Sequence, residues 1–208
     1  MKVLELFSGT KSFSNVCRER GFEVFTIDIN KKFKPDLCID INELNYGGIK
    51  ALEINRFDVI WASPPCEEYS HAKRTGVRDL IKADKNVLTA LRIIKELKPK
   101  FWIIENPQTG LLKDREFMKG IPFTDVSYCK YGMPYRKQTR LWNNFGFVGK
   151  VCNKDCNFIK DKKHIGSAGN GRKKYTDKNY KLTDKYRVPR QLCEELLSKI
   201  GNNSEVKK

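Results

Sequence analysis

The sequence predicts an α/β fold with a mostly parallel sheet and helices on both of its faces. Over the first 149 residues, strand-like and helix-like runs alternate, as they do in repeated strand–helix–strand units. Of the 208 residues, 39% are hydrophobic, so the chain can bury a core without a disulfide or a structural metal. No apolar run approaches the roughly 18 residues of a membrane span, and the opening MKVLELF does not resemble a secretory signal. A membrane span and a disordered chain are therefore excluded.

The predicted strands are short runs rich in β-branched, leucine and aromatic residues. The first, 3–7, is followed by the breaker Gly9, and the second, 23–28, ends in Asp28. Two further runs have the same character and are bounded by polar residues, and a fifth leads into Asn106 and Pro107. The third, fourth and fifth predicted strands cover 37–40, 57–62 and 101–105. We expect two later strands around 125–129 and 139–142, which makes seven strands in all.

The predicted helices show apolar residues three and four positions apart. A helix through Val16 and Arg20 ends at Gly21, a common C-terminal residue of helices. A second helix is followed by Pro99, and its single apolar face comprises Val87, Leu88, Leu91, Ile94 and Leu97. A third begins near Val188 with Pro189 in its first turn, is closed by Gly201, and has an apolar face of Leu192, Cys193, Leu196, Leu197 and Ile200.

Composition divides the chain into a main domain and a basic insert. At about Lys150 the apolar periodicity stops, and the following stretch is rich in Lys, Asn, Asp and Gly. We therefore expect a main domain over 1–149, a basic insert over 150–187, a helix over 188–201 that packs back on the main domain, and a flexible tail over 202–208.

The net charge is the strongest bulk signal. With 41 Lys and Arg against 25 Asp and Glu, the chain carries +16, and residues 150–190 hold 13 of these bases and 4 of these acids. Such an excess favours a nucleic-acid partner, whereas a merely soluble basic protein is the alternative. The seven irregularly spaced cysteines favour reduced thiols and a cytoplasmic location over a disulfide framework.

The first motif is the turn after the first strand, Phe7-Ser8-Gly9-Thr10. A glycine lets a cofactor approach the backbone, and Asp28 follows it by 19 residues at the end of the next strand. A carboxylate at this spacing typically accepts hydrogen bonds from ribose hydroxyls. The dinucleotide pattern GxGxxG is absent, so an ordinary strand–helix turn with a solvated aspartate is the alternative.

The second and third motifs follow the fourth and fifth strands. Pro64-Pro65-Cys66 would hold a thiol at the carboxyl edge of the sheet, where it could act as a nucleophile, although a buried structural cysteine is the alternative. Glu105, with Trp102 nearby, could have a raised pKa and donate a proton, or it could cap a helix or pair with an arginine.

Together with the string YGMPYRKQTR at 131–140, these motifs resemble the cytosine-C5 DNA methyltransferase family. Their order along the chain agrees with that family, and the wider strings resemble its short, stand-alone branch encoded by phages and large viruses. The resemblance covers 1–149 well and continues weakly to Val188. It implies a Rossmann-like methyltransferase fold. We expect a monomer that is located in the cytoplasm, or in the host cytoplasm or nucleoid if the chain is encoded by a virus.

The resemblance implies S-adenosylmethionine as cofactor. Phe7 would pack on its adenine, Ser8, Gly9 and Thr10 would cradle its methionine part, and Asp28 beside Ile29 would hold its ribose. The remaining residues that would border the cofactor are Asp40, Ile41 and Pro64.

The resemblance also implies a covalent mechanism on DNA. Cys66 would attack C6 of cytosine, Glu105 would hydrogen-bond or protonate N3, and Arg140 would hold O2 or the glutamate with Lys137 close by. The base must be flipped out of the duplex or already single-stranded. The expected substrate-binding residues are Ser70, Asn106, Arg172, Lys173 and Lys174.

Two departures from the family keep alternatives open. Pro107 stands where the family commonly has a branched apolar residue, and only about 40 basic residues occupy the place of a target-recognition domain. RNA, including tRNA, is an alternative substrate, because sequence selection lies outside the motifs. A non-catalytic nucleic-acid-binding relative is a second alternative, which the intact motifs disfavour. Methylation of free nucleotides is a third, which the basic insert disfavours.

The remaining candidates are a possible metal site and a loop. Cys152, Cys156 and His164 have the spacing Cx3CxxxxxxxH, and Cys129 could add a fourth ligand. Because the spacing is irregular, we expect reduced thiols and no metal, with zinc as the alternative. His71 is expected at the surface or against DNA, and residues 67–85 are expected to form a mobile loop that closes over DNA through Lys73, Arg74, Arg78 and Lys82.

Overall fold

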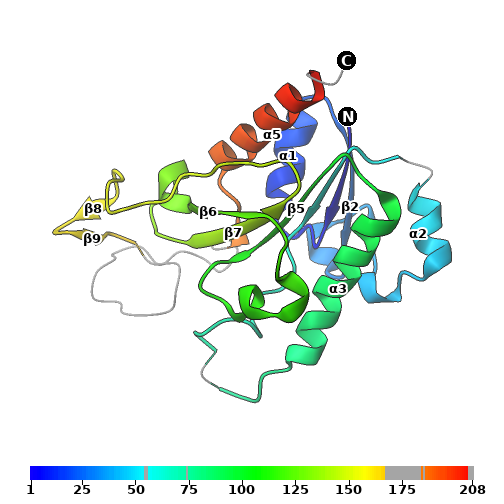
Figure 1. Cartoon of the computed structure of the whole chain (residues 1–208), viewed down its shortest axis with the longest axis horizontal. Coiled ribbons are helices and arrows are strands. Elements are labelled where there is room, and N and C mark those ends of the chain that lie inside the picture. The colour runs from blue at the N-terminus through cyan, green and yellow to red at the C-terminus, as the bar shows by residue number, and fades with distance from the viewer. Residues whose placement is uncertain (54–55, 74, 167–183, 185, 206–208) are drawn as a thin grey trace.

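A seven-stranded sheet forms the centre of the computed structural model, which describes residues 1–53, 56–73, 75–166, 184 and 186–205 (Figure 1). Its strand order is β3-β2-β1-β4-β5-β7-β6. In chain order the strands are β1 Lys2–Leu6, β2 Glu23–Asp28, β3 Leu37–Cys38, β4 Val59–Ala62, β5 Phe101–Pro107, β6 Phe123–Ser127 and β7 Gln138–Asn143. The predicted α/β class and the seven mainly parallel strands are confirmed.

The order of the strands reverses at β1, and this places a crevice at the edge of the sheet. β1 pairs in parallel with β2 on one side, where Leu6 lies opposite Ile27, and with β4 on the other, where Leu6 lies opposite Ala62. In an open α/β sheet, ligands bind outside the carboxyl ends of the strands at such a switch point. Only β7 runs antiparallel to its neighbours, β5 and β6.

Helices cover both faces of the sheet, as Figure 1 shows. On one face, α1 (Ser12–Glu19) and α5 (Arg190–Glu205) pack together, and on the other lie α2 (Tyr46–Glu53) and α3 (Leu80–Leu97). Phe13, Val16 and Cys17 of α1 are buried with Leu192 and Leu196 of α5. No described helix is both long enough and apolar enough to cross a bilayer.

Several helix boundaries differ from the sequence expectation. α3 begins at Leu80, because the Asp79 side chain accepts the Lys82 N–H at 2.9 Å and caps the helix. Residues 80–85 are therefore helical rather than part of a loop. α5 continues past Gly201 to Glu205, and α2, whose first turn contains Gly47 and Gly48, was not predicted.

The chain after β6 also differs from the expectation. β6 ends at Ser127, and Tyr128–Tyr131 form a 3-10 helix, η5, whose first two residues the sequence had placed in the strand. Within the basic insert, β8 (Ile159–Lys160) and β9 (Lys163–His164) form a short antiparallel hairpin. Arg74, Arg172, Lys173 and Lys174 lie outside the described residues.

Candidate active site

Two adjoining cavities form a crevice at the carboxyl ends of β1, β2, β4 and β5. The larger has a volume of about 640 Å³ and the smaller of about 410 Å³. Both are lined by Phe7, Asp28, Ser63 and Pro65, so the two spaces share a wall. The residues predicted for the cofactor and those predicted for the nucleophile therefore meet in one place.

The turn after β1 adopts an unusual backbone conformation. Phe7, Gly9 and Lys11 have φ values of 55°, 44° and 56°, in the left-handed region that disfavours side chains other than glycine. The turn is held by the Ser8 N–H, which donates to the Ile27 carbonyl at 3.1 Å, and by the Gly9 N–H, which donates to Asp28 Oδ2 at 2.8 Å. Such local strain persists only where the surrounding structure enforces it, and it is frequent at ligand sites.

Each carboxylate oxygen of Asp28 accepts one hydrogen bond from the protein and can still accept another from a ligand. Its Oδ1 accepts the Asn30 N–H at 2.7 Å, while Oδ2 accepts Gly9. An ionised carboxylate offers about four lone-pair positions, so two remain after these contacts. Because Asp28 lines both cavities, these positions can face ligand hydroxyls.

The larger cavity combines apolar walls with polar ends. The predicted residues Phe7, Ile29, Asp40 and Ile41 all line it. Asp40 is fixed because its side chain accepts the Asn42 N–H at 2.9 Å. Sequence reasoning missed the contribution of other segments to this cavity, namely Ile39, Glu68, Asp79, Lys82, Ala83 and Asn86. The α3 members could be found only once the true start of that helix was known.

Cys66 lies in the smaller cavity on the loop after β4. The carbonyl of Pro64 accepts a hydrogen bond from Asn106 Nδ2 at 2.9 Å, which joins the second motif to the third. Burial raises the pKa of the Cys66 thiol to about 11, with Lys137 opposing the rise and Glu105 and Glu67 adding to it. The thiol is therefore protonated at neutral pH until a bound ligand or a base changes its surroundings.

Glu105 is held by two partners on one of its oxygens. The Tyr128 hydroxyl donates to Glu105 Oε1 at 2.9 Å, and Lys137 Nζ lies 3.5 Å from the same atom. Burial raises the pKa of Tyr128 well above its usual value, so the phenol remains a donor. Both of these contacts involve Oε1, and no contact of Oε2 is found among the described residues, so this oxygen can face a substrate. Trp102 was expected beside Glu105 but lies on the opposite face of β5, since successive side chains alternate along a strand.

The structure places Arg140 away from the crevice, unlike Lys137. Arg140 forms two hydrogen bonds with Asp125 of β6, from Nε to Oδ1 at 2.7 Å and from an Nη atom to Oδ2 at 2.9 Å. Its guanidinium also lies 3.5 Å from the centre of the Phe123 ring. Asp125 is directly opposite Arg140 in the β6–β7 register, a pairing that the motif alone could not reveal. These contacts do not support the expected catalytic role of Arg140, which stays a prediction, whereas Lys137 lies beside Glu105.

The loop after Cys66 is tied to itself. Arg78 donates to the carbonyls of Glu68 and Ser70, each at 2.7 Å, and Lys73 pairs with Glu68 at 2.6 Å. Ser70 does not line either cavity, and its hydroxyl accepts the Ala72 N–H. Lys73 and Arg78 therefore make contacts within the loop. The sequence had led us to expect that these side chains contact DNA.

Two buried polar atoms in the smaller cavity have no partner within the described part of the chain. They are Ser8 Oγ and Asn106 Oδ1. A buried acceptor or hydroxyl without a partner costs about 1–3 kcal/mol, so such groups normally bind a ligand or water. Together with the apolar walls and Asp28, they fit a nucleoside cofactor that bears an amino-acid tail. The same cavity includes Glu5, whose pKa burial raises to about 7, and which the motifs did not indicate.

A second group of polar side chains lies outside the crevice. One ligand atom from each of Cys129, Cys152, Cys156 and His164 lies within 4.8 Å of the others. The sequence led us to expect unrelated reduced thiols here, so this convergence is a departure from that expectation.

Comparisons with known proteins agree with this geometry. The family model described as C-5 cytosine-specific DNA methylase matches residues 1–121. A frog virus 3 protein described as a probable DNA (cytosine-5)-methyltransferase is 34% identical over 95% of this chain and 99% of its own length. The type II methyltransferase M.NlaIV of Neisseria lactamica is 33% identical to this chain. The match covers 56% of this chain and 30% of that enzyme.

A solved structure supports the fold. It is a protein encoded within an E. coli prophage and described as a DNA modification methyltransferase, with a TM-score of 0.53 and 23% identity. The match covers 69% of this chain and 46% of that one.

Proposed function

Because this chain belongs to the C-5 cytosine-specific DNA methylase family, we propose that it transfers a methyl group from S-adenosylmethionine to C5 of cytosine in DNA. One observation carries the proposal. Cys66, Glu105 and Lys137 line the same cavity as Phe7, Ser8, Gly9 and Asp28, so a reacting base and a methyl donor can meet there.

The larger cavity suits the adenosine part of the donor. The aromatic ring of Phe7 and the apolar side chains of Ile29 and Ile41 would enclose adenine, while Asp28 would accept hydrogen bonds from the ribose hydroxyls. Ser8 Oγ, which has no other partner in the described chain, would bind the amino-acid tail. When bound, the cofactor supplies an electrophilic methyl group on a positively charged sulfur.

The protein must make C5 of cytosine nucleophilic. Cys66, after losing its proton, attacks C6 and forms an S–C6 bond, and the electron pair of the C5–C6 double bond becomes available at C5. In its carboxylic acid form, Glu105 donates the Oε2 proton to N3 and so neutralises the negative charge that develops on the ring, while Tyr128 and Lys137 orient the carboxyl group through Oε1. After C5 takes the methyl group, the C5 proton passes to solvent water and Cys66 leaves as a thiolate, which restores the C5–C6 double bond. N3 then returns its proton to Glu105, and the thiolate takes a proton from solvent.

Asn106 keeps the nucleophile in place during this cycle. Its Nδ2 holds the Pro64 carbonyl two residues before Cys66, and its Oδ1 is free to contact the base. The second motif follows β4 and the third lies in β5, so the pairing of these adjacent parallel strands and the Asn106–Pro64 hydrogen bond bring the two motifs together.

Nucleoside mass spectrometry tests the proposal. DNA from cells that express the chain should contain 5-methylcytosine, whereas RNA should not gain it. Cys66→Ala should abolish the product, and Cys38→Ala, which removes an exposed thiol, should serve as the matched control. Methylated RNA together with unmethylated DNA would identify RNA as the substrate instead of DNA. Full activity of Cys66→Ala would overturn the mechanism.

A trapping experiment gives an independent readout. The wild type should form a covalent adduct with DNA that contains 5-fluorocytosine, because fluorine cannot leave C5 as a proton does. Cys66→Ala should form none, even though its fold and cofactor binding are retained. An adduct of Cys66→Ala, mapped to another residue, would contradict the assignment of the nucleophile.

A further inference from the structure

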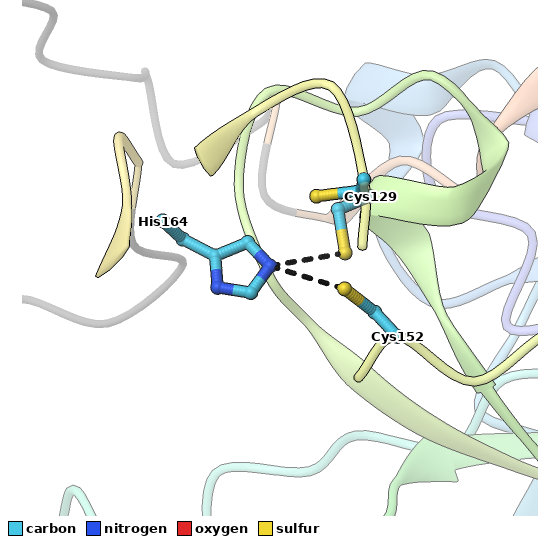
Figure 2. Close-up of side chains that lie close together, drawn as sticks. Cys129, Cys152 and His164 are labelled. Carbon is cyan, nitrogen blue, oxygen red and sulfur yellow. Dashed lines mark hydrogen bonds between the residues drawn. The ribbon is translucent and has the colours of Figure 1, made fainter. Parts of the chain in front are cut away.

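Four potential metal ligands from separate segments come together just beyond the carboxyl end of β6. Cys129 lies in η5, Cys152 and Cys156 lie in the irregular chain after β7, and His164 ends β9. Figure 2 shows the imidazole of His164 directed at the sulfur atoms of Cys129 and Cys152. We call these four residues the Cys3His cluster.

The distances within the Cys3His cluster suit a tetrahedral zinc ion. His164 Nε2 lies 3.5 Å from Cys129 Sγ and 3.4 Å from Cys152 Sγ. With Zn–S of about 2.3 Å and Zn–N of about 2.0 Å, a regular tetrahedron separates sulfur and nitrogen ligands by about 3.5 Å. The four ligand atoms all lie within 4.8 Å of one another, so an ion needs only small side-chain adjustments.

The backbone around the ligands is shaped to present them. The Cys152 N–H donates to Ser127 Oγ at 3.1 Å, which fixes this cysteine against the end of β6. Lys154, between the two cysteines of the second segment, has φ of 64°, so the chain turns back sharply there. Asp161 and Lys162 have φ of 50° and 60°, the conformation of a tight two-residue hairpin turn that returns the chain to His164.

The described part of the basic insert, 150–166, which carries three of the four ligands, has no apolar core of its own. Neither core cluster of the protein includes any described side chain between 148 and 187. A two-stranded hairpin such as β8–β9 is marginally stable alone. Gly166, just after His164, packs so closely on the Pro134 carbonyl that an added Cβ would lie 2.4 Å from it. The segment is thus docked on the main domain, yet apolar burial does not explain how it is held.

The chemistry of the cluster favours zinc over a disulfide. Three thiols can form at most one disulfide, which would leave one thiol and the imidazole without a role. Four protein ligands leave no open position for water or substrate, which is the arrangement of a structural rather than a catalytic site.

We propose that Cys129, Cys152, Cys156 and His164 bind one structural zinc ion that fastens the β8–β9 hairpin to η5. Binding releases the thiol protons to solvent as the Zn–S bonds form. The ion joins the start of the basic insert to the helix that carries Tyr128, the partner of Glu105. The site does not depend on the proposed methyl transfer.

Metal content and cobalt binding test this proposal. The full chain, purified under reducing conditions without a chelator or a polyhistidine tag, should contain one zinc per molecule by plasma mass spectrometry. Co²⁺ added to the metal-free protein should give the absorption of a tetrahedral site with thiolate ligands. Cys156→Ser and His164→Asn should each weaken Co²⁺ binding by at least about 100-fold. Cys38→Ser and His71→Asn remove an exposed thiol and an exposed imidazole outside the cluster, and they should bind as the wild type does.

Proteolysis of the wild type provides a second measurement that needs no variant. Removal of zinc should speed tryptic cleavage after Lys154, Lys160 or Lys163 by about tenfold or more, since the hairpin would open locally. Readdition of zinc should reverse this change. The proposal fails if the reduced, folded chain binds neither metal, if cluster and control variants bind Co²⁺ equally, if cleavage is indifferent to zinc, or if a disulfide links two of the three cysteines.

Discussion

The crevice and the Cys3His cluster each gather cysteine with other polar groups, but the fold assembles them differently. Phe7, Cys66 and Glu105 lie at the carboxyl ends of β1, β4 and β5, so hydrogen-bonded strand pairing fixes where they meet. Cys129 and His164 are 35 residues apart and share no sheet. The crevice is therefore a product of the main-chain architecture, whereas the cluster depends on its own side chains and on the ion that we propose.

This difference predicts which property each region controls. Substitutions in the crevice should reduce binding or chemistry while the fold survives, because the sheet persists without them. Substitutions in the cluster should remove metal and local order while the chemistry of Cys66 persists. The following experiments test the crevice side of the comparison, each with zinc content as a second readout that should not change.

Glu105→Gln should have the largest effect. The amide keeps the shape of the side chain and can still accept from Tyr128, but it cannot give a proton to N3. We expect the rate of methyl transfer to fall by about 10²- to 10⁴-fold, the usual contribution of a general acid. Single-turnover kinetics measure this loss, with Glu116→Gln, a change at an exposed carboxylate, as the control. A loss matched by a collapse of the melting temperature would mean that Glu105 supports the fold instead.

The reactivity of Cys66 should rise steeply with pH. Since its pKa is about 11, the reactive thiolate should increase about tenfold per pH unit between pH 7 and 10. The rate of alkylation by iodoacetamide, followed by peptide mass spectrometry, measures this dependence. A plateau near pH 8 would indicate that the thiol is not desolvated in solution.

The same pKa has a consequence for stability. The folded state holds the Cys66 proton more tightly than the unfolded chain does. The resulting contribution to the free energy of unfolding is complete below the usual thiol pKa and is lost as pH rises through about 11. Cys66→Ala should therefore lose less stability than the wild type over that range, which chemical denaturation at matched pH values can measure.

Asp28→Ala should weaken cofactor binding more moderately. Loss of a charged hydrogen-bond partner costs about 1–3 kcal/mol, and the substitution also leaves the Gly9 and Asn30 N–H groups without an acceptor. Asp28→Asn keeps one acceptor oxygen and should fall between the two. Calorimetric titration with S-adenosylmethionine gives the affinities. If all three proteins have the same Kd, Asp28 only holds the turn.

Arg140→Lys should have the smallest effect on the reaction. Because Arg140 contacts Asp125 and Phe123 outside the crevice, we expect kcat to stay within about threefold, with a stability cost near 1 kcal/mol. Lys137→Met, beside Glu105, should lower kcat by much more. The opposite ranking would return Arg140 to the catalytic group.

The sequence predicted the crevice well because its motifs follow strands. Strand pairing is regular, so the ends of β1, β2, β4 and β5 had to converge once a parallel sheet was inferred. It did not predict the pairing of Arg140 with Asp125, because a partner on β6 decides where that side chain points and the motif does not specify the register between β6 and β7. The sequence named the four residues of the Cys3His cluster as a zinc alternative, but their irregular spacing favoured reduced thiols, because spacing does not show that the four side chains converge. The ligands of the cluster meet through two turns with positive φ at lysine and aspartate, residues that do not mark such turns as glycine would.

The packing of α5 on α1 has a consequence for the order in which the protein can be completed. The apolar residues Phe13, Val16 and Cys17 emerge early from the ribosome, but Leu192 and Leu196, which cover them, are made last among the described elements. At about 5–20 residues per second, the first helix waits roughly 10–35 s for its cover. During that interval the nascent chain exposes one face of its sheet, and we expect chaperones that bind unfinished chains to recognise it there.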